Sequence, residues 1–213
     1  MNKGKNMILY VMRHGTTEWN IQQKMQGQAD IPLNEKGKED AIKASFKLKD
    51  IHFNKCYCSP LIRAKETANL VLSDKTCEII PEDLLKEITF GINEGKTMDM
   101  INNDPENALH TYFKSPENYI PAKGGESVYD LLKRGNKFLT KISKEEHNSQ
   151  KILIVSHGAF IKGLITIVNH QSAADFWHHK EQKNCAVTVF EFKDGKWKLL
   201  QDAVDILAGE KLQ

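Results

Sequence analysis

Residues 7–15 read MILYVMRHG and residues 152–158 read ILIVSHG. Each stretch is a short, continuous apolar run that ends in a histidine followed by a glycine. Runs of this length are typical of strands that are buried on both faces, as in a parallel sheet. The two stretches therefore predict two buried, neighbouring strands with a histidine directly after each one.

The remaining pattern alternates between strands and helices. Helical spacing of apolar residues predicts helices over residues 61–72 and 128–142, and Asn34 is a good cap residue for a third helix. We expect an α/β fold: a three-layer sandwich with a mostly parallel sheet, helices on both faces and one antiparallel edge strand, which the hairpin signal Asp194-Gly195 appends. Further strands are expected at residues 56–58, 79–80, 186–192 and 197–200.

The length and composition are those of an ordinary globular protein. A chain of 213 residues, 40% hydrophobic and 27% charged, can bury a substantial core, so residues 1–213 are expected to form a single domain. Residues 91–125 differ from the rest because they hold several prolines and asparagines and only a weak helical pattern around residues 98–101. We expect this segment to be a lid or an insertion.

The charge balance and the start of the chain argue against several classes of function. Lys plus Arg total 30 against 28 for Asp plus Glu, which gives no whole-protein field for binding nucleic acid. The apolar run after residue 6 is too short for a signal peptide or a membrane span, so we expect a cytoplasmic protein that does not bind membranes. Four cysteines without paired spacing are expected to be free thiols rather than zinc ligands: Cys56, Cys58, Cys77 and Cys185.

Charged and polar side chains follow three of the expected strands. Arg13 and His14 follow the first, Arg63 lies just after the second, and His157 follows the strand at residues 152–155. Ligands of parallel α/β sheets bind beyond the carboxyl ends of the strands, so these four side chains should converge. Taken singly, a histidine after a strand is more often structural; the joint placement is what favours a functional site.

This set of side chains suits phosphoryl transfer. Each guanidinium offers a fork of donors that matches two phosphate oxygens. A neutral imidazole such as His14 can attack phosphorus, and the displaced oxygen then needs a proton from a nearby acid. Glu87 is the candidate acid, provided that burial raises its pKa; Glu126 and Glu18 are the next candidates. No metal ion or other cofactor is needed, because the two arginines and two histidines supply the positive charge.

At these residues the chain resembles the histidine phosphatase superfamily, in its phosphoglycerate mutase-like branch. The resemblance begins with Arg13-His14-Gly15 and continues, in the family's order, over nearly the whole chain. It includes the stretches at residues 59–68, 87–95, 124–127 and 156–158. The departures are mild: Gln28 stands where an aromatic residue is frequent, Asn34 where Thr or Ser is common, and Asn93 where Trp often precedes Glu-Gly.

The resemblance implies a role for each residue of the site. His14 would be the phosphorylated residue and Glu87 the proton donor. Arg13, Asn20, Arg63 and His157 would hold the phosphoryl group, so His157 belongs to both the catalytic and the phosphate-binding set. The implied activity is a phosphatase that acts on a small-molecule phosphate monoester through a phosphohistidine intermediate.

Other interpretations stay open. Residues 91–97 resemble a nucleotide-binding P-loop, but they have one residue too few between the glycines and no strong helix after them. His170, together with His178 and His179, suggests a metal site near a helix end, although adjacent histidines on a helix point about 100° apart. A non-catalytic protein that binds a phosphate ligand would keep the same fold.

Within the family, a cofactor-dependent phosphoglycerate mutase is the alternative to a phosphatase. Mutases of this family carry a longer insertion after the acid region, with extra basic residues, whereas this chain is short there. Its only basic side chains in that segment are Lys96, His110, Lys114 and Lys123, which favours hydrolysis. The sequence leaves the physiological ester open among sugar phosphates, phosphoglycerates, nucleotide-pathway intermediates and α-ribazole phosphate, and it leaves homo-oligomerisation open too.

Overall fold

The computed structural model describes residues 6–145 and 150–212. Its centre is a six-stranded sheet in which four parallel strands are followed by an antiparallel pair. The strands lie in the order β3 (Ile79–Pro81), β2 (Lys55–Cys58), β4 (Gln150–Ser156), β1 (Asn6–Arg13), β5 (Val187–Lys193) and β6 (Lys196–Val204).

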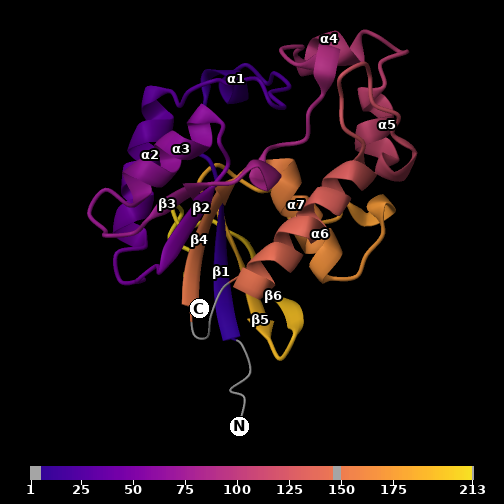
Figure 1. Cartoon of the computed structure of the whole chain (residues 1–213). Coiled ribbons are helices and arrows are strands. Elements are labelled where there is room, and N and C mark those ends of the chain that lie inside the picture. Colours follow the sequence, from indigo (N-terminus) through magenta and orange to yellow (C-terminus); the bar gives the residue numbers. More distant parts are fainter. Residues whose placement is uncertain (1–5, 146–149, 213) are drawn as a thin grey trace.

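Two helices cover each face of the sheet (Figure 1). Alternate residues of β1 face opposite sides, as the pleat of a strand requires. Leu9 and Val11 join the core that lies under α6 (Val128–Glu145) and α7 (Gly158–Val168). Tyr10 and Met12 join the other core, under α2 (Glu35–Lys47) and α3 (Ile62–Val71). The predicted three-layer α/β sandwich is confirmed.

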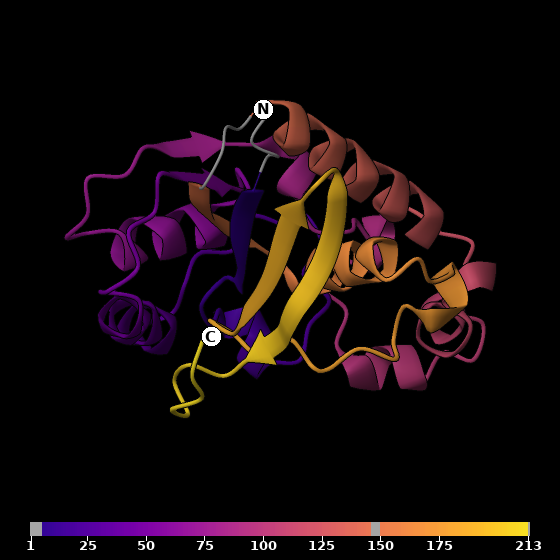
Figure 2. The same cartoon turned by 90° about the horizontal axis from the view of Figure 1, so that it is seen from below.

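Local signals of the sequence have the expected effects. The side chain of Asn34 caps α2 by accepting a hydrogen bond from the Gly37 N–H (2.9 Å). Asp194 and Gly195 both adopt positive φ angles, 50° and 81°, as the tight turn of a two-residue hairpin requires. That turn joins β5 to β6 (yellow in Figure 2), and this pair forms the antiparallel edge of the sheet.

Residues 91–125 lie beyond the carboxyl ends of the parallel strands (Figure 1). They contain η2 (Gly91–Asn93), α4 (Met98–Asn102), α5 (Leu109–Lys114) and η3 (Pro116–Asn118). Tyr112 of α5 anchors the segment, because its ring centroid lies 5.1–5.2 Å from those of Phe90, Tyr119 and Trp177. The Trp177 Nε1–H also donates to the Tyr112 carbonyl (2.7 Å). The single domain and the action of this segment as a lid stay predictions.

Two further expectations concern the membrane and the cysteines. Among the described residues, no helix combines the length and the apolar character that crossing a bilayer requires. All four cysteines are free thiols in the structure; Cys56, Cys58 and Cys185 are buried, whereas Cys77 is half-buried.

Candidate active site

A cavity of about 260 Å³ lies at the carboxyl end of the parallel strands. It is lined by Arg13, His14, Asn20, Arg63 and Glu87, all of which the sequence singled out. The remaining candidate, His157, is fully buried next to His14, with 5.2 Å between the two ring centroids. The structure thus brings all six predicted residues together, while their chemical roles stay predictions.

His14 is fixed at both its backbone and its ring. Its N–H donates to the Ser156 carbonyl at the end of β4 (2.9 Å), and its ring Nδ1 lies 2.7 Å from the Gly15 carbonyl oxygen. Because a carbonyl oxygen only accepts, Nδ1 carries the hydrogen and the lone pair of the neutral ring is on Nε2. Burial, followed by the charges of Arg63 and Arg13, holds the pKa of His14 well below its ordinary value of 6.5.

Gly15 allows helix α2 to approach the end of β1. A Cβ added at Gly15 would lie 2.7 Å from the Gly37 carbonyl oxygen, and one added at Gly37 would clash with the backbone of Thr16. Neither clash can be relieved by a side-chain movement. The Gly15 N–H also donates to Thr67 Oγ1 on α3 (2.9 Å). The segment that carries His14 is therefore held against both helices of this layer.

Arg13 and Arg63 reach the cavity from different elements and are held by backbone carbonyls. Arg13 ends β1, and its Nη1 donates to the Gln182 carbonyl (2.6 Å). Arg63, in the first turn of α3, donates to the carbonyls of Ala29 (2.8 Å) and Gly27 (2.7 Å). The buried Nε atoms of both arginines have no hydrogen-bond partner among the described residues. Burial lowers the pKa of Arg63 to about 10, which leaves it charged near neutrality.

His157 follows β4 and is the N-cap residue of α7. Its Nε2 lies 2.8 Å from Ser59 Oγ, which also accepts a hydrogen bond from the Leu61 N–H (3.3 Å). The hydroxyl hydrogen of Ser59 can therefore go to His157 Nε2, which places the imidazole hydrogen on Nδ1. That buried Nδ1 has no partner among the described residues. Burial, followed by Arg63, lowers the pKa of His157 well below 6.5.

Asn20 lies on the short helix α1 (Glu18–Ile21). Its Oδ1 accepts hydrogen bonds from the N–H and the hydroxyl of Thr17 (3.0 and 3.1 Å) and from Asn184 Nδ2 (3.4 Å). Because the oxygen is used within the protein, Nδ2 is the group that can donate into the cavity that Asn20 lines.

Glu87 follows η1 (Asp83–Leu85) and reaches the N-terminus of α7. Its Oε1 accepts from the N–H groups of Ile88 (2.9 Å) and Phe160 (3.0 Å), and its Oε2 from that of Ala159 (3.1 Å). Loss of water around the carboxyl raises the pKa of Glu87, although these N–H groups and the two arginines oppose the shift. A cavity-lining carboxyl with a raised pKa can hold a proton and release it.

The P-loop-like residues 91–97 form no phosphate cradle. The backbone N–H groups of residues 92–96 all donate to protein carbonyls instead. Glu94 closes the turn further, since its carboxylate accepts from the N–H groups of Gln28 and Phe90 (2.9 and 3.1 Å). Only the five-residue helix α4 follows Thr97.

The placement of His178 and His179 on a helix is wrong. Both lie in the bend after η4 (Ala173–Asp175). His179 Nε2 lies 2.9 Å from Thr166 Oγ1, whereas His178 pairs with Asp175 (3.4 Å), so the two rings are engaged separately. Within residues 6–145 and 150–212, no group of three or more His, Cys, Asp or Glu side chains is placed to hold a metal ion.

The rim of the cavity contains residues that the sequence did not single out. We define the rim residues as Lys24, Phe113, Lys162, Trp177 and Glu181. Lys162 Nζ donates to the carbonyls of residues 179 and 180 (2.7 and 2.8 Å) and lies 5.5 Å from the Trp177 ring centroid. The rings of Phe113 and Trp177 are 5.6 Å apart. No spacing pattern links these residues, because they come from separate segments of the chain.

Three known proteins resemble this chain over most of its length. The probable phosphoglycerate mutase GpmB of Escherichia fergusonii is 27% identical over 192 residues, which cover 89% of this chain and 86% of the relative. The solved structure of Entamoeba histolytica phosphoserine phosphatase with 3-phosphoglyceric acid is 32% identical, with a TM-score of 0.80 and coverage of 92% and 96%. That of a putative α-ribazole-5′-P phosphatase from Escherichia coli K-12 is 27% identical, with a TM-score of 0.83 and the same coverage.

The family model for the histidine phosphatase superfamily (branch 1) matches residues 9–204. This range runs from β1 to the end of β6 and includes all six residues gathered at the cavity. The resemblance seen in the sequence is therefore confirmed, and the chain belongs to branch 1 of the histidine phosphatase superfamily.

Proposed function

We propose that this histidine phosphatase hydrolyses a phosphate monoester of a small molecule, with His14 as the nucleophile and without a metal ion. The observation that supports this most directly is the ring of His14. Its Nδ1 is tied to the Gly15 carbonyl, so Nε2 keeps the lone pair that attack on phosphorus requires. The unpartnered Nε atoms of Arg13 and Arg63 supply donors for phosphoryl oxygens.

In the first step, Nε2 of His14 forms a bond to phosphorus and the ester P–O bond breaks, with its electron pair going to the ester oxygen. Protonated Glu87 gives its proton to that oxygen, so the alcohol leaves neutral. Arg13, Arg63, Asn20 and Nδ1 of His157 hold the phosphoryl oxygens and stabilise the charge that develops on them.

In the second step, a water oxygen bonds to phosphorus and the N–P bond breaks, which returns the lone pair to His14. Glu87, now a carboxylate, takes a proton from the water. The arginines supply the charge that metal ions supply elsewhere, so turnover should survive exhaustive EDTA treatment. Loss of turnover that returns with added zinc or magnesium would contradict this mechanism.

A rapid-quench experiment with ³²P-labelled ester tests the proposal. We expect a phosphoramidate that survives alkali but not acid, located on His14 by peptide mapping. His157→Ala should slow its formation and still label His14, whereas His14→Ala should abolish the label. Label on Ser59, Ser156 or His157 of the unmodified protein would overturn the assignment.

The role of Glu87 as general acid can be tested by varying the leaving group, because only a poor leaving group needs a proton in the transition state. Glu87→Gln should reduce hydrolysis of an alkyl phosphate by about 10²-fold or more and affect an aryl phosphate with an acidic phenol far less. Equal losses on both esters would assign Glu87 a structural role. The alternatives Glu18 and Glu126 are less well placed: Glu18 is exposed, and Glu126 is paired with Arg134 (2.7 Å).

Phosphoglycerate mutase activity is the second candidate, favoured by the name of the GpmB relative. Against it, Lys96, His110, Lys114 and Lys123 are absent from the described residues that line the cavity. Assays with 3-phosphoglycerate separate the two reactions, since a phosphatase releases inorganic phosphate and a mutase forms the 2-phospho isomer. A protein that only binds phosphate ligands would show no turnover of p-nitrophenyl phosphate.

We also propose a cytoplasmic location and a small-molecule phosphate as the binding partner. Four unpaired cysteines support a reducing compartment. Cell fractionation with an antibody to the native chain tests the location, and a panel of sugar phosphates, phosphoglycerates, phosphoserine and α-ribazole phosphate tests the partner.

A further inference from the structure

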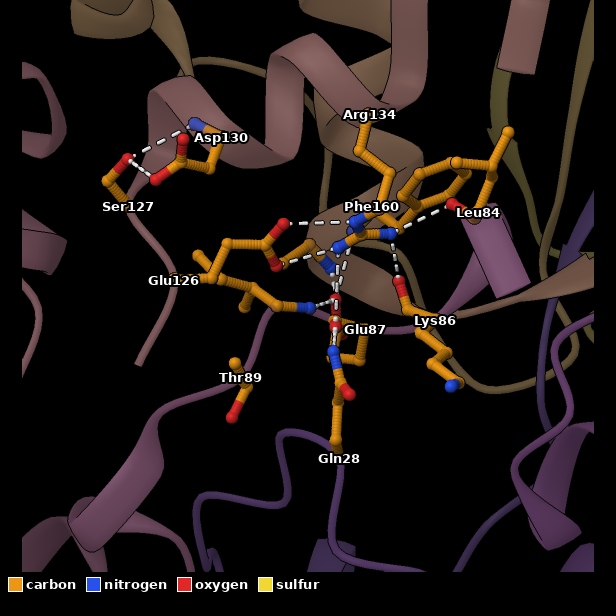
Figure 3. A network of polar contacts seen from close by, with 12 residues as sticks. Gln28, Leu84, Lys86, Glu87, Thr89, Glu126, Ser127, Asp130, Arg134 and Phe160 are labelled. Atoms are coloured by element: carbon orange, nitrogen blue, oxygen red, sulfur yellow. Dashed lines mark hydrogen bonds and ion pairs between the residues drawn. The ribbon is translucent and has the colours of Figure 1, made fainter. Parts of the chain in front are cut away.

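The guanidinium of Arg134, on α6, is bonded both to the segment that carries Glu87 and to the carboxylate of Glu126 (Figure 3). Its Nη1 donates to the carbonyls of Leu84 (2.8 Å) and Lys86 (2.7 Å). Its Nη2 donates to the carbonyl of Glu87 itself (3.4 Å) and to Glu126 Oε2 (2.7 Å), and its Nε to Glu126 Oε1 (2.9 Å). These bonds account for all five guanidinium hydrogens.

The guanidinium of Arg134 also packs against Phe160, the residue whose backbone N–H binds the Glu87 carboxylate. Its Cζ lies 5.1 Å from the ring centroid of Phe160, and the Phe160 N–H donates to Glu87 Oε1 (3.0 Å). A further bond comes from Gln28 Nε2 to the Glu87 carbonyl (3.0 Å). Glu87 is thus held at its backbone by Arg134 and Gln28, and at its carboxylate by the helix that Arg134 packs against (Figure 3).

Arg134 and Glu126 do not belong to the cavity wall as the described residues form it, whereas Glu87 does. A half-buried arginine that is bonded to three carbonyls of this segment, and that does not line the cavity, is placed to act on the position of the acid rather than on the substrate. The fork geometry matters, because a planar guanidinium fixes several acceptors relative to one another as a flexible ammonium does not.

Glu126 also offsets the positive charge of Arg134 in the surroundings of Glu87. Glu87 interacts with the charges of Arg13 and Arg63 and with the hydroxyl of Tyr112, and its carboxylate binds the N-terminus of α7. The two titratable imidazoles of the site also lie nearby: His14 lines the same cavity, and His157 is the N-cap residue of α7. A bare guanidinium behind Glu87 would add to the two arginines and favour the ionised carboxylate. The bidentate bond to Glu126, whose side chain is 14% exposed, offsets the charge of Arg134 at short range.

We propose that the Arg134–Glu126 pair is a positioning device for the general acid: it fixes the backbone of Glu87 so that the carboxyl faces the leaving group, and it does so without adding net positive charge beside that carboxyl. This inference rests on the proposed role of Glu87. Gln28, which stands where the family often has an aromatic residue, serves the same end through its bond to the Glu87 carbonyl.

The test compares an alkyl phosphate with an aryl phosphate of an acidic phenol in the full-length enzyme. Arg134→Met should lower kcat/KM by about 100-fold on the alkyl ester, the order of loss expected for a displaced catalytic group. The loss on the aryl ester should be far smaller, and Arg134→Met should add little when Glu87→Gln is already present. Lys141→Met is the matched control, because it removes an ion pair to Glu82 (2.6 Å) from the same helix at the other end of the same segment, and both esters should be spared.

Glu126→Gln gives a second readout if Arg134→Met fails to fold. It keeps an acceptor for Arg134 and removes the compensating charge, so the pKa of Glu87 should fall. Since the acid must be protonated to act, the alkaline limb of kcat on the alkyl ester should move to lower pH, by about one unit.

The outcomes separate this inference from the proposed function. If Glu87→Gln discriminates between the two esters and Arg134→Met does not, only the positioning role is wrong. An unmoved pH limb in Glu126→Gln overturns the charge offset. If Glu87→Gln itself shows no discrimination, the acid assignment fails and the positioning role fails with it.

Discussion

At the inner end of the cavity, the two arginines and the two histidines come from the carboxyl ends of strands or from the first turn of the helix that follows. Arg13 and His14 end β1, Arg63 begins α3 after β2, and His157 follows β4. Four of the five rim residues instead come from short helices and irregular segments, such as α5 and the bend after η4, whereas Lys162 lies on α7. One end of the cavity is built by the sheet, and the other by connections between its elements.

The two ends also differ in how their side chains are held. Each inner side chain is fixed by backbone groups or by a buried hydroxyl, as with Arg63 on two carbonyls and His157 on Ser59. At the rim, Trp177 and Lys162 also donate to backbone carbonyls, but the ring of Phe113 is held by contacts with the rings of Tyr112 and Trp177, which fix geometry less tightly. Fixed donors suit the shared part of every substrate, the phosphoryl group, and the rim is left to recognise the part that varies.

The largest difference between the two ends is expected when one charged side chain is removed from each and the loss of kcat/KM is compared. Arg63→Met should lower kcat/KM for any monoester by about 10³-fold, because it removes a preorganised donor from the developing charge. Lys24→Met, at the half-exposed rim, should change kcat/KM only a few-fold, since water screens its charge. Steady-state kinetics on one ester decides the matter, and similar losses in both variants would show that the two ends are not functionally distinct.

The two buried histidines at the inner end should make the free energy of unfolding depend on pH. Both imidazoles have folded-state pKa values below the ordinary 6.5, so above that pH neither the folded nor the unfolded chain binds protons there. Below pH 6.5 the imidazoles bind protons in the unfolded chain but not in the folded chain. The free energy of unfolding therefore decreases as the pH is lowered. Each histidine can contribute a slope of up to about 1.4 kcal/mol per pH unit.

His157→Gln should remove one such slope, as measured by urea unfolding at pH values from 7.5 to 5. Glu87 acts in the opposite direction, because its raised pKa favours the folded state as pH falls through that value, but its contribution is common to both proteins. Lys24→Met at the rim serves as the control and should keep the slope of the unmodified chain. An unchanged slope in His157→Gln would mean that its imidazole is protonated in the folded protein.

The inner end could be predicted from the sequence because the rule that places it is local. A short apolar run predicts a strand, and the residue after the run must lie at the ligand-binding edge of a parallel sheet. Helix α7 was not predicted, since nine of its eleven residues are buried and no polar face separates residues 158–168 from the apolar strand before them. Helix α5 was missed for a different reason: its six residues are ordered by aromatic contacts made with distant parts of the chain.

Arg134 shows why a positioning residue escapes pattern analysis. On an amphipathic helix, an arginine that directly follows a lysine looks like part of a solvated face. Only the folded chain shows that three carbonyls of residues 84–87 lie within reach of its guanidinium. The same holds for Gln28, whose bond to the Glu87 carbonyl joins residues 59 positions apart.

The smallest expected effect is at the rim, and it concerns selectivity. Phe113→Ala should raise KM for naphthyl phosphate by about 10-fold, the order expected when a large apolar contact is lost. KM for glycerol phosphate, which is too small and polar to gain from the ring, should barely change, and kcat should stay the same on both. Phe46→Ala on α2 is the control, because that ring is 63% exposed and lies on a helix that contributes no cavity-lining residue among those described. If Phe113→Ala lowered kcat equally on both esters, the ring would be supporting the inner end through Tyr112, and the rim would be part of the catalytic scaffold rather than a separate recognition surface.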